Sequence, residues 1–144
     1  MIKVSIITVV KNDFQKIEKT INSVLVQIYT NYEFIIIDGQ STDGTLGVIQ
    51  KYKDNLSLYL SEPDSGIYEA MNKGLAKATG EYVLFLNSGD YLVDKDVLTR
   101  TIPFLILQND IVYGKISNRP QWQSEIKVKD ILFMVFITLQ IKKQ

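Results

Sequence analysis

The stretch Glu81-Tyr-Val-Leu-Phe-Leu-Asn-Ser-Gly-Asp90 decides the fold, because an apolar run typical of a buried strand ends abruptly in oxygen-bearing side chains. Upstream, Phe34-Ile-Ile-Ile37 runs in the same way into Asp38-Gly-Gln-Ser-Thr-Asp43. Open α/β sheets bind their ligands just beyond the carboxyl ends of buried strands. Two such strand ends with carboxylates can hold a nucleotide together with a divalent metal ion.

Strands and helices are expected to alternate along the chain. The runs of strand length and composition are Val4–Val10, Glu33–Ile37, Leu56–Leu60, Tyr82–Leu86 and the short Asp110–Tyr113. Apolar residues at helical spacing lie between them, over Ile17–Ile28, Leu46–Tyr52 and Ile67–Ala78, and a further helix is expected from about Asp94. This order predicts an α/β fold with a mainly parallel central sheet flanked by helices.

The expected helix ends involve a few particular residues. Asn12 is expected to cap the first helix, with Gln15 completing a capping box, and Asp43 is interpreted as a cap of the second rather than a ligand. Gly80 is expected as the C′ residue of the third helix. Gly74 lies inside that helix at a cost of about 1 kcal/mol relative to alanine, so close packing, a nearby ligand or simple tolerance would explain it.

The composition limits the available chemistry. The chain has 144 residues, 46% of them hydrophobic, which suits one domain with one core. It contains neither Cys nor His, so disulfides and thiolate or imidazole metal sites are excluded, and Asp and Glu remain for acid–base and metal chemistry. The net charge is zero, but residues 115–144 are basic, a feature that fits a solvated end better than an anionic partner.

No secretory signal is expected at the start, because Met1 leads almost directly into a strand. The longest apolar run, Ile131–Leu139, is shorter than the roughly 20 residues that span a bilayer. A cytoplasmic protein is therefore expected. We interpret the run as a core strand or helix in preference to an interfacial helix, which would contact the inner face of a membrane.

Each polar cluster has a structural and a functional interpretation. Asp38 can accept hydrogen bonds from a base or ribose, or it can simply form a turn with the next glycine. Asp64 can cap the helix that begins near Gly66, and the same helix end can receive a phosphate. Asn87 to Asp90 can bind Mn²⁺ or Mg²⁺, or form a type I turn. Three clusters on one edge favour the functional interpretation.

Taken together, these residues resemble the nucleotide-binding part of the family 2 glycosyltransferases, which have the GT-A fold. The motifs that carry the resemblance are Val4–Asn12, Ser23–Gln27, Asp38–Thr45, Glu62–Gly74 and Ala78–Asp90. The segment Glu62–Gly74 is especially similar to bacterial members that build surface polysaccharides. The resemblance implies a Rossmann-like nucleotide-sugar-binding core over 1–114 and a divergent, basic and apolar tail over 115–144, which forms an incomplete acceptor-side region.

The resemblance also implies a site. Its expected nucleotide-binding residues are Thr8, Val10, Asn12, Asp38, Asp64, Gly66, Asn72, Asn87 and Ser88. The segment Asn87–Asp90 occupies the place of the family's metal-binding Asp-x-Asp, so Asp90 is the expected ligand of Mn²⁺ or Mg²⁺. The sequence departs from the family pattern at Gly39, where a second acid usually stands, and in having only one carboxylate in the metal segment.

The implied reaction is transfer of a sugar from a nucleotide-diphosphate donor, a UDP-sugar by expectation, to an acceptor hydroxyl, with inversion and metal assistance. The partners would be this donor and a saccharide or lipid-linked acceptor in polysaccharide or glycolipid synthesis, with no nucleic acid. Peripheral membrane contact and a homo-oligomer stay open, and no catalytic base is identified.

Two other classes of function can be compared with that of a glycosyltransferase. Family members continue well past Gly114, where the match fades, so the chain is interpreted as truncated at its carboxyl end. The alternative is a non-catalytic nucleotide-sugar-binding or interaction module that lacks the acceptor half. A dinucleotide-dependent oxidoreductase is disfavoured, because no Gly-x-Gly-x-x-Gly follows the first strand.

Overall fold

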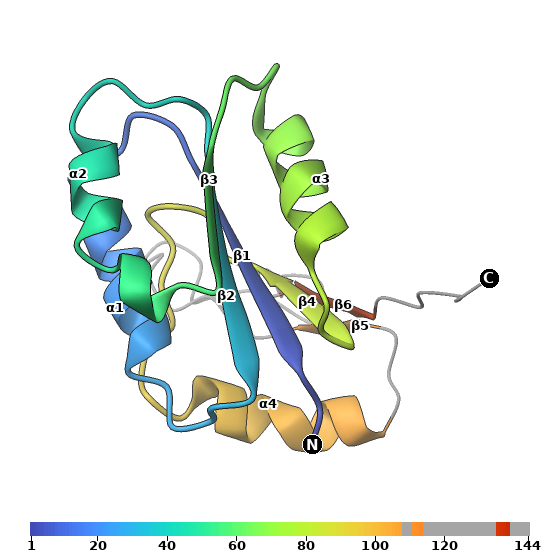
Figure 1. Ribbon diagram of the computed structural model, residues 1–144. Coiled ribbons are helices and arrows are strands. Elements are labelled where there is room, and N and C mark those ends of the chain that lie inside the picture. Colours follow the sequence, from blue (N-terminus) through green and yellow to red (C-terminus); the bar gives the residue numbers. More distant parts are fainter. Residues whose placement is uncertain (108–110, 114–134, 139–144) are drawn as a thin grey trace, which may run out of the picture.

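The computed structural model describes residues 1–107, 111–113 and 135–138. Within them the elements run in the order β1 (Val4–Val10), α1 (Ile17–Leu25), β2 (Tyr32–Asp38), α2 (Thr45–Gln50), the 3₁₀ turn η1 (Lys53–Asn55), β3 (Leu58–Ser61), α3 (Ile67–Lys77), β4 (Tyr82–Phe85), α4 (Val97–Ile106), β5 (Ile111–Tyr113) and β6 (Val135–Thr138). The described strands form one sheet in the order β3-β2-β1-β4-β6-β5 (Figure 1). The predicted α/β fold is confirmed.

The register brings the ends of the first four strands to one edge. β1 pairs in parallel with β2 from Val4 opposite Tyr32 to Val10 opposite Asp38, and β4 lies parallel on the other side of β1. β3 continues the parallel sheet beyond β2, whereas β6 is antiparallel to both β4 and β5. We call the edge where β1 to β4 end the carboxyl edge, and the opposite edge, where they begin, the amino edge.

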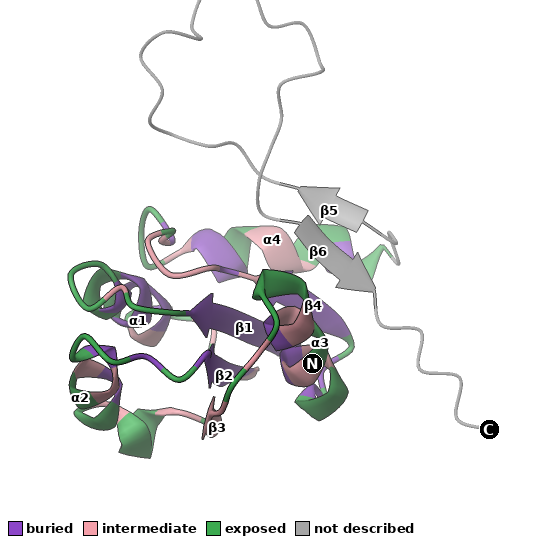
Figure 2. Cartoon of the chain, turned by 90° about the horizontal axis from the view of Figure 1, so that it is seen from above, coloured by how far each residue is buried: buried purple, intermediate pink, exposed green. Residues whose placement is uncertain are grey.

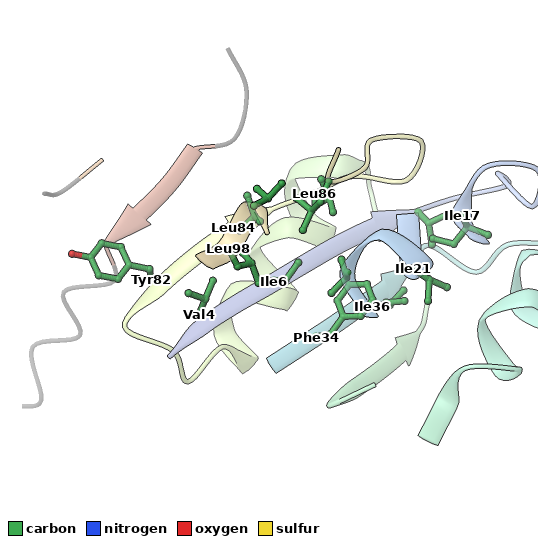
Figure 3. Packing of buried hydrophobic residues seen from close by; sticks show 14 of the residues in the cluster. Val4, Ile6, Ile17, Ile21, Phe34, Ile36, Tyr82, Leu84, Leu86 and Leu98 are labelled. Atoms are coloured by element: carbon green, nitrogen blue, oxygen red, sulfur yellow. The ribbon is translucent and has the colours of Figure 1, made fainter. Parts of the chain in front are cut away.

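Helices cover both faces of the sheet, and nearly all residues of β1, β2 and β4 are buried (Figures 1 and 2). In β1 successive residues alternate between two cores, because side chains of a strand point to opposite faces. Ile6 packs in the cluster with Phe34 and with Ile21 of α1 (Figure 3), whereas Ile7 packs beneath α3 with Ala70. The continuous apolar runs of the sequence follow from this two-sided burial.

The predicted cap of the first helix is wrong. α1 begins at Ile17, five residues after Asn12, and its N-cap residue Lys16 makes no side-chain capping bond. Asn12 instead lies in the loop after β1 with a left-handed φ of 51°. Its side-chain oxygen accepts a hydrogen bond from the Thr42 N–H at 2.8 Å, and its own N–H donates to Ser41 Oγ at 2.7 Å. Asn12 therefore joins two loops.

The two glycines of the third helix region are explained by close packing. A Cβ on Gly74 would lie 2.5 Å from Ile7 Cγ2, so the glycine lets α3 approach β1. Gly80 is not a C′ residue, because α3 ends at Lys77 and Ala78 is already extended. A Cβ on Gly80 would lie 2.7 Å from the backbone nitrogen of Ser5, so this position needs glycine where the chain crosses the start of β1.

Two further segments can be compared with their predictions. Asp43, predicted as a cap of the second helix, precedes the N-cap, which is Gly44; its Oδ1 nevertheless accepts from the Thr45 N–H, at the first residue of α2, at 3.0 Å. Within the run Ile131–Leu139, the described residues Val135–Thr138 form strand β6 of the central sheet. The described part of the chain contains no helix with the length and apolar character to cross a membrane.

Candidate functional site

The loops at the carboxyl edge are joined to the end of β1. The Gly39 N–H, just after β2, donates to the Val10 carbonyl at 2.9 Å, and the Ser88 N–H, just after β4, donates to the Val9 carbonyl at 3.1 Å. The Glu62 N–H, just after β3, donates to the Asp38 carbonyl at 3.0 Å. The expected site segments therefore start side by side, as parallel strands require.

Asp38 is fully buried and its carboxylate is engaged within the protein. Its Oδ2 accepts from the Ser41 N–H at 3.0 Å and from Ser61 Oγ at 2.6 Å, while Oδ1 accepts from Ser41 Oγ. These bonds fix the β2–α2 loop and tie it to the end of β3. The structure thus shows Asp38 as the centre of the loop framework at the expected edge.

Thr8 and Val10 also lie inside this framework. Both are buried, and the Thr8 hydroxyl donates to the Leu86 carbonyl at 2.6 Å, which joins β1 to the end of β4. Asn12, by contrast, is exposed, and it joins the loops after β1 and β2 as described above. Of these three expected residues, only Asn12 presents its side chain at the surface of the edge.

Asp64 lies against Gly39, because a Cβ on Gly39 would collide with Asp64 Oδ2. The absence of a side chain at position 39, where the family has an acid, makes room for this carboxylate. Asp64 Oδ1 accepts from the Gly66 N–H at 3.1 Å, so that helix-end N–H is already engaged. Gly66 has a φ of 143°, which favours glycine. Asn72 is exposed on α3.

The loop that carries Asp64 is held by Lys73 of α3. Its ammonium group contacts Glu62 Oε1 at 2.9 Å and Glu69 Oε1 at 3.1 Å, and it donates to the Pro63 carbonyl at 2.7 Å. Glu69 in turn accepts from the Ser65 N–H at 2.8 Å. The pKa of Glu69 is lowered to about 2, first by the Ser65 bonds and then by Lys73. The β3–α3 loop is therefore ordered at the site.

The segment Asn87–Asp90 follows β4 and holds the least satisfied polar groups. Among the described residues, Asn87 Oδ1 and Tyr59 Oη are the buried side-chain atoms without a hydrogen-bond partner. The Asp90 residue is exposed, yet the protein around its carboxyl group removes part of its hydration, and this desolvation raises its pKa. The turn between them is fixed by Gly89, whose φ is 94°. Both side chains thus have capacity for a ligand.

Sequence reasoning missed Asp13. This residue follows β1 in the loop that starts at the carboxyl edge, and its Oδ2 accepts from Ser88 Oγ at 2.7 Å. It therefore links the β1–α1 loop to the metal candidate segment. The signal was present in the sequence, because Asp13 lies three residues past a buried strand, in the kind of position that singled out Asp38.

The donor atoms at this edge have the chemistry of a hard-cation site. In the part of the chain that the structure describes, no three acidic side chains gather into a group that could hold a metal ion. The available oxygens are the Asp90 carboxylate and Asn87 Oδ1. Mn²⁺ and Mg²⁺ prefer oxygen ligands and often take one or two from the protein and the others from water and substrate phosphates. Asp90 and Asn87 fit such a shared cation.

A mainly parallel sheet with helices on both faces and polar loops at its carboxyl edge defines a Rossmann-like nucleotide-binding class of domain. The sequence profile described as Glycosyl transferase family 2 matches residues 5–142. This chain therefore belongs to the family 2 glycosyltransferases.

A curated relative and solved structures agree with this assignment. The chain is 40% identical over 106 residues to the putative teichuronic acid biosynthesis glycosyltransferase TuaG of Bacillus subtilis. The aligned region covers 72% of this chain and 42% of TuaG. S. aureus TarS in complex with UDP-GlcNAc superimposes with a TM-score of 0.73 at 29% identity, over 82% of this chain and 35% of TarS.

A third comparison adds a metal ion. The mannosyltransferase PcManGT from Pyrobaculum calidifontis, in complex with GDP-Man and Mn²⁺, gives a TM-score of 0.71 at 25% identity, over 82% of this chain and 36% of PcManGT. These structural neighbours are GT-A glycosyltransferases, so the fold is GT-A. The chain spans less than half the length of each of these three proteins.

Proposed function

We propose that the carboxyl edge binds the nucleotide-diphosphate part of a sugar donor, and that the protein transfers the sugar to an acceptor hydroxyl with the help of Mn²⁺ or Mg²⁺. One observation carries this proposal. Asn87 Oδ1 is a buried acceptor with no partner among the described residues, and it lies just past the carboxyl end of β4, the kind of position at which open α/β sheets bind their ligands. A buried acceptor of this kind costs free energy unless a ligand completes it.

The residues at the carboxyl edge would have different roles in donor binding, set by the chemistry of their side chains. Asn87 Oδ1 and the Asp90 carboxylate would hold the cation or accept hydrogen bonds from the donor. The bound cation would offset charge on the departing diphosphate. Asp64 and Asn12 supply polar groups from the neighbouring loops, while Asp38 keeps those loops in place. We assign no catalytic base.

The finer identity of the donor is part of the proposal. UDP is the proposed nucleotide, supported by the complex of TarS with UDP-GlcNAc, although PcManGT was crystallised with GDP-Man. The Mn²⁺ in the PcManGT complex supports metal assistance. The name of TuaG supports a product in bacterial surface polysaccharide. Inversion at the sugar carbon belongs to the same proposal and rests on the family resemblance.

Calorimetric titration with UDP tests the site. The wild-type chain should bind UDP more tightly with Mn²⁺ than without it, and Asp90→Asn should weaken binding in the presence of Mn²⁺ about tenfold, or about 1.4 kcal/mol. This change removes the charge at constant size. Asp38 is a poorer choice, because its replacement would also release the loops that it holds.

The matched control is Asp54→Asn, which removes the same charge from an exposed residue of η1. It should leave UDP affinity unchanged. Equal affinity of wild type and Asp90→Asn for UDP with Mn²⁺ would refute Asp90 as the metal ligand. Absence of UDP and GDP binding under all metals would refute the donor site itself.

A further inference from the structure

Helix α1 presents buried polar side chains to the loop that follows β4. Thr20, Ser23 and Gln27 are each less than 10% exposed, although the rest of the buried surface of α1 is apolar. Their spacing along the chain places them along one side of the helix and its carboxyl end. Hydrogen bonds from all three reach the backbone of the segment from Gly89 to Leu98.

The contact closest to the site comes from Thr20. Its hydroxyl accepts a hydrogen bond from the Gly89 N–H at 3.0 Å and donates one to the Asp90 carbonyl at 2.7 Å. The Thr20 side chain therefore holds the backbone on both sides of the Asp90 Cα, at the Gly89 N–H before it and at the Asp90 carbonyl after it. Farther along, Ser23 Oγ accepts from the Leu92 N–H at 3.1 Å, and Gln27 Nε2 donates to the Asp94 carbonyl at 2.6 Å.

We propose that Thr20 is a positioning residue, which fixes the direction of the Asp90 carboxylate toward the donor diphosphate and its cation. This inference rests on the proposed function. The turn at Gly89 has a φ of 94°, which glycine adopts about as readily as a negative φ, so the flexible turn keeps one direction only if neighbouring groups hold it. The Thr20 hydroxyl supplies that hold without contacting the ligand itself.

The physical reason for such a hold is the narrow tolerance of metal and phosphate sites. Productive geometry must be kept to within about 0.5 Å, and groups that orient a metal ligand are typically worth 10- to 100-fold in metal affinity. Asp90 is the only carboxylate within Asn87–Asp90, so a turn of its backbone would redirect the one charge that this segment contributes. A valine at position 20 would fill the same volume but could not hold the peptide.

The test compares Thr20→Val with Thr20→Ser and Ser23→Ala. UDP is titrated by calorimetry with and without Mn²⁺, on the complete chain, after thermal melts have checked folding. Thr20→Val should weaken Mn²⁺-dependent UDP binding about tenfold, while metal-free UDP binding stays within about twofold of wild type. Thr20→Ser, which keeps the hydroxyl, should restore the affinity. Ser23→Ala removes a buried hydroxyl beyond Asp90 and should lower stability without changing the affinity.

The outcomes separate this inference from the proposed function. If Asp90→Asn weakens Mn²⁺-dependent binding and Thr20→Val does not, the positioning role is overturned. An equal loss with and without Mn²⁺ in Thr20→Val would also overturn it, because that loss would come from general unfolding of the site. If Asp90→Asn itself has no effect, the proposed metal site fails. If Thr20→Val does not fold, Thr20→Ala, which removes the same hydroxyl, is used in its place.

Discussion

Both edges of the sheet carry polar side chains, yet they differ in how completely these are paired. At the amino edge, Glu33 is buried and contacts the Lys3 ammonium at 2.8 Å and Thr79 Oγ1 at 2.7 Å. Ser5 Oγ donates to Glu33 and accepts from the Gly80 N–H at 2.8 Å. The donors and acceptors of this cluster are matched to one another.

At the carboxyl edge the pairing is incomplete. Asp38 accepts hydrogen bonds on both of its carboxylate oxygens, but in the described portion of the chain Asn87 Oδ1 is buried without a partner. Asp90 points its carboxylate into a partly desolvated position at the surface. Buried polar atoms are nearly always paired, so a matched cluster indicates a structural role and an unmatched one indicates a ligand. The two edges therefore predict opposite responses to substitution.

The largest expected effect is at the amino edge, on Gly80→Ala. The added Cβ would lie within 2.8 Å of the backbone atoms Ser5 N and Lys3 O, which cannot move aside without disturbing β1. We expect a loss of about 3 kcal/mol in the free energy of unfolding, measured by urea denaturation. UDP affinity of the folded protein should be unchanged. Wild-type stability in this variant would show that the crossing over β1 is looser than the structure indicates.

The next largest effect is expected for Glu33→Gln, which should lower the free energy of unfolding by about 2 kcal/mol at neutral pH. Burial alone would raise the pKa of Glu33, but hydrogen bonds from Lys3, Ser5 and Thr79 outweigh it and lower the pKa to about 2. Because the folded pKa lies below the unfolded value of 4.5, the contribution of Glu33 is complete above pH 4.5 and is lost as the pH falls toward 2.

Urea denaturation of both proteins between pH 2 and 7 checks this prediction. The difference in stability between wild type and Glu33→Gln should shrink steadily below pH 4.5. A difference that stays constant down to pH 2 would mean that Glu33 acts through packing and not through its charge.

The smallest expected effect on stability is at the carboxyl edge, on Asn87→Ala. The change removes a buried oxygen that lacks a partner among the described residues, so the free energy of unfolding should change by no more than about 0.5 kcal/mol. UDP affinity should nevertheless fall. A large loss of stability in this variant would remove the contrast between the two edges, since it would show that Asn87 is a structural residue like Glu33.

The fold could be predicted from sequence because its signals are local. The β-branched run Val4–Val10 and the change to helical spacing after it follow directly from two-sided burial and from one-sided packing. The ends of elements were less predictable. The third strand was expected at Leu56–Leu60 and lies at Leu58–Ser61, because the chain first bonds through Ser57 to Phe34 before it joins the sheet.

The position of the candidate site at one edge of the sheet could be predicted from the sequence, but the hydrogen bonding of each of its residues could not. The rule that ligands bind beyond buried strands located Asp38, Asp64 and Asp90 at one edge. It did not show that two serines donate hydrogen bonds to the Asp38 carboxylate, since one of them, Ser61, comes from the neighbouring strand β3, 23 residues along the chain. The predicted capping roles of Gly80 and Asn12 were wrong for the same reason, because the position of each depends on a neighbour far along the chain.

The pairing of β6 with β4 has a consequence for how the chain folds. Tyr82 lies opposite Thr138, so this part of the sheet closes only when residues 56 positions apart in sequence meet. Contacts of such long sequence separation form slowly, because a large loop must first be ordered. Until then one side of β4 offers free backbone groups to any other extended chain. Production of this protein should therefore be most vulnerable to aggregation before β6 joins the sheet, and chaperones that bind extended segments should increase its yield.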